Sequence, residues 1–118
     1  MLIDWMAPEI ARADGVLIRR LTVPHIARRA RGDLACVVVP CGADASSWVA
    51  RLVRFGVAAM VSPLPVPCVA GAPVDPVLRA CDCVIVPPVA GWASCARVVN
   101  AVRVAVSTNR AAYLVRDM

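Results

Sequence analysis

Two different hydrophobic periods alternate along the chain, and their order predicts an α/β protein. Residues 34–39 (Leu-Ala-Cys-Val-Val-Val) form a continuous apolar run with many β-branched side chains, as is typical of a parallel strand that is buried on both faces. Residues 57–61, 83–86 and 111–115 are shorter runs of the same kind. We therefore predict a buried strand in each of the four runs.

Two segments between these runs have apolar residues at helical spacing. The first ends at Gly56, and Asp44 or Ser46 can cap its start. Its expected apolar stripe is Trp48, Val49, Leu52, Val53 and Phe55, with Arg51 and Arg54 pointing outward. The second is predicted from Trp92 to about Val106, with a stripe of Cys95, Val98, Val99, Val102 and Val106.

The first third of the chain has a weaker pattern. Its predicted elements are a helix over 3–13, a strand or linker over 16–23 and a helix over about 25–31. Thr22 can cap the second helix, because Pro24 then falls in its first turn and Gly32 ends it.

This order of elements predicts a three-layer, Rossmann-like (flavodoxin-like) domain, in which helices cover both faces of a parallel sheet of four or five strands. Its length of 118 residues fits one domain. We assign residues 1–33 to an N-terminal helical or extended extension and residues 34–118 to the Rossmann-like domain. The proline-rich segment 64–75 is predicted to be an irregular connection.

The composition of the chain predicts what its core consists of and whether it lies in a membrane. Apolar residues make up 60% of the chain but aromatic residues only 4%, so the core is expected to consist of small aliphatic side chains, with enough apolar surface left for a homo-oligomer. The uncharged span 56–74 contains four prolines, which exclude a membrane helix. No basic segment leads into an apolar run at the start of the sequence, so we expect a cytoplasmic location.

The net charge of +5 comes from arginine alone. Arg19, Arg20, Arg28, Arg29 and Arg31 lie close together in the sequence, and such a cluster can bind nucleic acid or form a solvated face. We favour the solvated face, because no aromatic residue that could stack on a base is interleaved with these arginines.

The cysteines, the histidine and the serine near a helix start do not form a complete metal-binding or catalytic motif. Six cysteines lie partly within apolar runs, where reduced, buried thiols are expected. Cys81 and Cys83 lack a Cys-x2-Cys pair and His25 is the only histidine, so neither a metal site nor a cofactor is predicted. Ser94 and Cys95 lie near a predicted helix start, where either could be a nucleophile. The chain has no Gly-x-Ser-x-Gly motif of the kind that holds the nucleophile of hydrolases, so a hydrolase triad is not predicted.

Four short motifs resemble those of the nucleoside 2-deoxyribosyltransferase-like family, particularly its small bacterial and phage members of undefined function. In order they are Val37-Val-Val-Pro40, Leu52-Val-Arg-Phe-Gly56, Ser62-Pro63-Leu64, and Cys81-Asp82 followed by Gly91-Trp92. The resemblance covers about residues 34–115 and implies cleavage of an N-glycosidic bond by a glutamate nucleophile on the helix after Gly91-Trp92.

The chain departs from this family at the nucleophile. The resemblance places the glutamate at about Asn100 or Ala101, and the only glutamate of the chain is Glu9. An amide cannot replace an anionic nucleophile. We therefore expect a pseudoenzyme whose reaction is absent or much reduced, with Asn100 and Asp44 as weak catalytic candidates.

The expected function is nucleoside or nucleotide binding in the crevice beyond the carboxyl ends of the strands. The residues expected to line it are Pro40, Cys41, Gly42, Ser62, Pro63, Gly91, Trp92 and Ser94. Two alternatives stay open. One is an assembly protein that binds itself or another protein through an apolar surface, and the other is an active N-glycosidase or deoxyribosyltransferase with a non-standard nucleophile.

Overall fold

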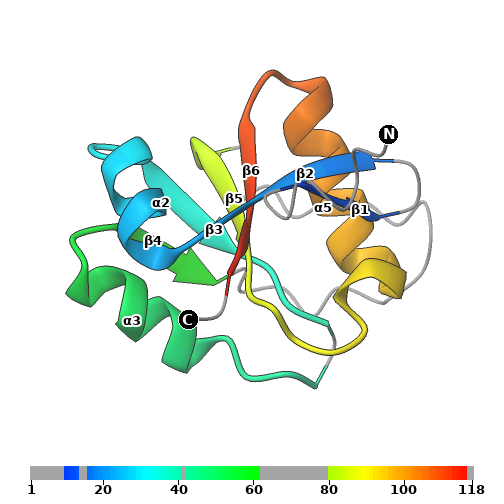
Figure 1. Ribbon diagram of the computed structural model, residues 1–118, viewed down its shortest axis with the longest axis horizontal. Helices are drawn as coiled ribbons and strands as arrows, with labels where there is room; N and C mark the ends of the chain where they lie inside the picture. Colours follow the sequence, from blue (N-terminus) through cyan, green and yellow to red (C-terminus); the bar gives the residue numbers. More distant parts are fainter. Residues whose placement is uncertain (1–9, 14–15, 41, 62–79, 117–118) are drawn as a thin grey trace.

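A computed structural model describes residues 10–13, 16–40, 42–61 and 80–116 (Figure 1). Its strands are β1 (Ile10–Ala13), β2 (Val16–Leu21), β3 (Leu34–Val37), β4 (Ala58–Val61), β5 (Cys83–Val86) and β6 (Ala111–Val115). Its helices are α2 (Val23–Arg29), α3 (Ser46–Arg54) and α5 (Ala96–Ser107), with a 3-10 turn, η1 (Trp92–Ser94), before α5. None of these helices is long and apolar enough to cross a membrane.

The strands form one sheet in the order β1-β2-β6-β5-β3-β4. Every neighbouring pair is parallel except β1 and β2. The predicted Rossmann-like α/β fold is therefore confirmed, with five parallel strands. β3 lies between β4 and β5, so that Cys36 is opposite both Met60 and Val84.

Helices cover both faces of the sheet (Figure 1). The side chains of Val37 and Ile85 pack with residues of α2 and α3 on one face. Their neighbours Cys36 and Val84 pack with residues of α5 on the other face. This division follows from strand geometry, because successive side chains point to opposite sides of a sheet. Strands that are covered twice need continuous apolar runs, as the sequence has.

The structure corrects the prediction for residues 10–13, which form strand β1 and not the end of a helix. β1 pairs with β2 from Ile10 opposite Arg19 to Ala13 opposite Val16. The dipeptide between the paired ends is Asp14-Gly15, a sequence that two-residue hairpin loops favour and the signal that should have indicated a hairpin. β2 also pairs with β6, so the sheet continues into the first third of the chain.

The start of α2 follows the sequence prediction. Thr22 has an extended backbone, and its Oγ1 accepts a hydrogen bond from the backbone N–H of His25 at 3.4 Å. Pro24 lies in the first turn, where its missing N–H costs no helical hydrogen bond. This short helix therefore begins at a well-defined residue.

Polar contacts tie together the edge of the sheet where the parallel strands begin. The backbone N–H of Leu34 donates to Asp82 Oδ2 at 2.9 Å, and the N–H of Asp82 donates to the carbonyl of Leu34 at 2.7 Å. Arg110 Nε donates to the carbonyl of Cys81 at 2.9 Å. These contacts fix the starts of β3, β5 and β6 relative to one another, and they place Asp82 at the edge opposite the expected crevice.

The apolar stripes of the two longer helices are narrower than predicted. Val53, Phe55 and Val106 are about half exposed, at 54%, 47% and 51%. On α3 the buried contact comes from Leu52, with Trp48 and Val49 partly buried beside it. Arg51, expected to point outward, lies over the ring of Trp48 at 4.9 Å from its centroid.

Leu52 and Val53 provide a matched pair for testing this packing. Replacing Leu52, which is fully buried, by alanine should lower the free energy of unfolding by about 2–5 kcal/mol, because it leaves a cavity between α3 and the sheet. Val53→Ala should change it by less than about 0.5 kcal/mol. Urea unfolding followed by circular dichroism gives both values, and equal effects would contradict the placement of α3.

Candidate functional site

The candidate site lies beyond the carboxyl ends of β3 and β5. These two strands are neighbours, but the segments that follow them diverge. The chain leaves β3 for α3 on one face and leaves β5 for α5 on the other. Such a point of divergence opens a crevice in doubly wound α/β folds, and ligands bind there. The loops 38–45 and 87–95 border it, and both lie at the lower edge of the sheet in Figure 1.

The loop after β5 passes from one face of the sheet to the other. Val89 packs against the core on the α2 and α3 side, whereas Trp92 packs against the core on the α5 side. Gly91, which lies between them, has φ of 84°, a left-handed conformation that a residue with a side chain adopts only with strain. The loop is therefore anchored at both ends, and Gly91 provides the turn that brings Trp92 to its side.

The loop after β3 carries the only charged residue of the two loops, Asp44. Its Oδ1 accepts a hydrogen bond from the N–H of Ser46 at 2.9 Å, at the start of α3. The predicted N-cap is nevertheless wrong, because the residue at that position is Ala45, whose side chain makes no capping hydrogen bond; Asp44 lies one residue before it and binds only the first N–H of the helix. Asp44 is exposed, and Oδ2 accepts no hydrogen bond from any residue that the structure describes, so it can still accept donors from a ligand.

Of the residues expected to line the crevice, five lie in the described part of these loops. Pro40 and Trp92 are half-buried, and Gly42, Gly91 and Ser94 are exposed. The hydroxyl of Ser94 donates to the carbonyl of Gly91 at 3.3 Å. The other three, Cys41, Ser62 and Pro63, lie outside the described residues.

Asn100 is the fifth residue of α5 and is half-buried. The helix that follows Gly91 and Trp92 thus has an amide in the region where the resemblance requires a carboxylate. Neither Asn100 nor its neighbour Ala101, which is buried, can ionise to attack a sugar carbon. Asp44 is the one carboxylate of the bordering loops, and one of its oxygens already accepts the hydrogen bond from the N–H of Ser46.

The described cysteines are not joined in disulfides. Cys36, Cys81 and Cys83 are buried, as expected, and Cys95 is half-buried just before α5. Within the described residues, no three His, Cys, Asp or Glu side chains lie together in a group that could hold a metal ion. His25 lies in the first turn of α2.

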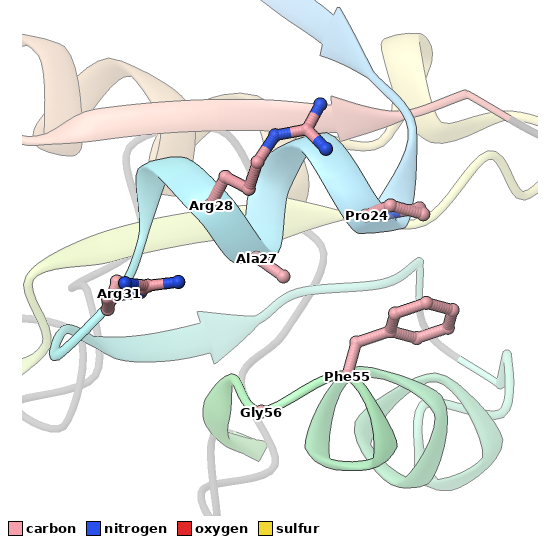
Figure 2. Close-up of a pocket in the computed structure, with 6 residues that line it drawn as sticks. All are labelled: Pro24, Ala27, Arg28, Arg31, Phe55 and Gly56. Carbon is pink, nitrogen blue, oxygen red and sulfur yellow. The ribbon is translucent and has the colours of Figure 1, made fainter.

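A concave surface between α2 and the end of α3 was missed by the sequence analysis. We call it the basic groove. It has a volume of about 380 Å³ and is lined by Pro24, Ala27, Arg28, Arg31, Phe55 and Gly56 (Figure 2). The sequence pattern failed here because Phe55 is separated from the arginines by more than twenty residues, and only the packing of α2 beside α3 places them on one surface.

Comparison of the chain with protein-family models, with curated proteins and with solved structures found no match. The family resemblance therefore stays a prediction that rests on the four sequence motifs.

The buried thiol of Cys83 predicts a loss of stability at alkaline pH. Burial, together with the negative charges of Asp33 and Asp82, raises the pKa of Cys83 to about 12, and burial also raises the pKa of Tyr113. In the unfolded chain a thiol ionises near its ordinary pKa of about 8.5. Between about pH 8.5 and 12 the unfolded state therefore binds fewer protons, and the free energy of unfolding should fall as pH rises.

Urea unfolding at intervals from pH 7 to 10 measures this decline. Cys83→Ala should flatten it, because the variant has no thiol to ionise at that position. An equal decline in Cys83→Ala, or constant stability of the parent protein across this range, would contradict the assignment.

Proposed function

We propose that the protein binds an uncharged nucleoside in the crevice between the loops 38–45 and 87–95 and does not cleave it. The observation that carries this proposal is the divergence of the chain after β3 and β5, because doubly wound folds bind nucleotides and related ligands at such points. The motif resemblance supports a nucleoside as the ligand class.

The charges of the crevice favour a nucleoside over its phosphate esters. The two loops contain one charged residue, the carboxylate of Asp44. A carboxylate at the start of α3 occupies the place where the helix would otherwise attract a phosphate. It repels phosphate and can accept hydrogen bonds from sugar hydroxyls. The half-buried indole of Trp92 offers an apolar surface for a base.

The same residues argue against N-glycosidic cleavage. The reaction needs an anionic group that attacks the sugar or stabilises its positive charge. Asn100 supplies an amide, which can position a hydroxyl but cannot form a glycosyl intermediate. The resembling region thus keeps the loops that would recognise a nucleoside without the group that would break its glycosidic bond.

Thermal shift with 2′-deoxynucleosides and their 5′-monophosphates tests this proposal. A nucleoside should raise the melting temperature with increasing concentration, by the equivalent of about 2.7 kcal/mol at 100 times its Kd. Its monophosphate should have a smaller effect. Trp92→Ala should remove the response, whereas Asp44→Asn, which keeps an oxygen that accepts from the N–H of Ser46 but has no charge, should remove the preference for the nucleoside.

Chromatography of the same mixtures should show no free base above the uncatalysed background. No response to any nucleoside would reject binding in the crevice. Release of base at a rate that Asn100→Ala or Asp44→Asn abolishes would instead establish an active enzyme with a non-standard nucleophile.

Assembly is the second candidate function, and two observations favour it. β4 is an edge strand of apolar residues, and no described strand pairs with its outer side. Val53 and Phe55 expose about half of their surface at the end of the helix that precedes it. An unpaired apolar edge is a template for pairing with another chain.

Light scattering at micromolar concentration tests assembly. A dimer that Ala58→Lys converts to a monomer would place the interface at β4, because a lysine on the exposed first residue of the strand opposes edge pairing. A monomer at every concentration would reject assembly and would leave the nucleoside proposal unaffected.

A further inference from the structure

The basic groove combines positive charge with an exposed aromatic ring. Arg28 and Arg31 are exposed, and neither forms a hydrogen bond or an ion pair with any residue that the structure describes. The ring of Phe55 is 47% exposed. No carboxylate is among the residues that line the groove. A surface with these properties is complementary to a ligand that is both anionic and aromatic.

Figure 2 shows how these side chains are arranged. Phe55 extends from the end of α3 toward Pro24 of α2. Arg31 extends along α2 from the turn that follows the helix, and Arg28 extends from the helix away from Phe55. The two guanidinium groups thus come from the α2 side of the groove and the aromatic ring from the α3 side.

Local helix chemistry explains part of this pattern but not all of it. Arg28 lies in the last turn of α2, where a positive charge stabilises the helix. Arg31 lies beyond the helix end, and Phe55 leaves nearly half of its surface in water although it lines the same groove as both arginines. Gly56 has no side chain that could fill the space, and a Cβ atom there would meet nothing within 4 Å. The groove is therefore open beside Gly56.

We propose that the basic groove binds single-stranded nucleic acid, with one base stacked on Phe55 and the flanking phosphates at Arg28 and Arg31. Arginine pairs with phosphate through two parallel hydrogen bonds, and stacking on an aromatic ring tolerates any base. A strand fits better than a free nucleotide, because Arg28 and Arg31 extend in different directions from α2 (Figure 2), so that a single phosphate group does not reach both. The segment from Arg19 to Arg54 contains seven arginines and two aspartates.

This site is distinct from the crevice proposed to bind a nucleoside. The crevice has one negative charge and no arginine in its bordering loops, whereas the groove has two arginines and no carboxylate. The two proposals are tested by substitutions at different residues. Either proposal can therefore be rejected while the other stands.

Fluorescence anisotropy with a labelled oligodeoxythymidylate tests the groove, measured between about 50 and 200 mM salt. Phe55→Ala should weaken binding roughly 5- to 100-fold through loss of stacking, with an unchanged salt dependence. Arg28→Gln with Arg31→Gln should weaken binding and reduce the slope of log K against log salt by about 1.4, for two phosphate contacts.

The matched control is Arg97→Gln with Arg103→Gln, which removes the same charge from α5 on the other face of the sheet. This control should have a smaller effect on affinity and slope than the groove variant. Melting curves confirm that each variant is folded, which is expected because Phe55, Arg28 and Arg31 are exposed.

Three results would overturn the proposal. The first is no binding at the lower salt concentration. The second is equal loss in the groove and control variants together with no effect of Phe55→Ala, which would indicate attraction of any polyanion by net charge. The third is competition by a free mononucleotide at the concentration at which the oligonucleotide binds, which would indicate a nucleotide site.

Discussion

The pairing of β3 with β5 is the constraint on which the rest of the structure depends. Because these neighbouring strands are followed by segments on opposite faces, the sheet must be covered twice, and Val37 and Ile85 face α2 and α3 while Cys36 and Val84 face α5. The same divergence places the candidate site at their carboxyl ends, because doubly wound folds bind ligands at such points. Core and candidate site are thus two consequences of one strand pairing.

Charge divides the surface into two regions with different chemistry. The loops at the crevice hold a single carboxylate, and the groove between α2 and α3 holds arginines next to an exposed ring. An uncharged ligand with hydroxyl groups suits the first region and a phosphate-bearing strand suits the second. The proposed functions follow from this difference between the two sites.

The sequence predicted those features that depend on local pattern. The four strands β3 to β6 were evident from their continuous apolar runs, and the start of α2 was evident from Thr22 and Pro24. The predicted burial is wrong for β4, because it is an edge strand and its residues are exposed or half-buried. The hairpin of β1 and β2 was missed although Asp14-Gly15 signals it. The exposure of Phe55 and its position near Arg31 depend on how α2 and α3 pack together, which no local pattern encodes.

The most direct test of the central claim is a nitrogen–proton correlation spectrum recorded during titration with a 2′-deoxynucleoside. The amides of Gly42, Ala43, Gly91 and Trp92 should shift together and saturate, while those of α2 and the end of α3 stay unchanged. Shifts that gather around Phe55 and Arg31, or no saturable shift at all, would contradict a nucleoside site at the point where β3 and β5 diverge.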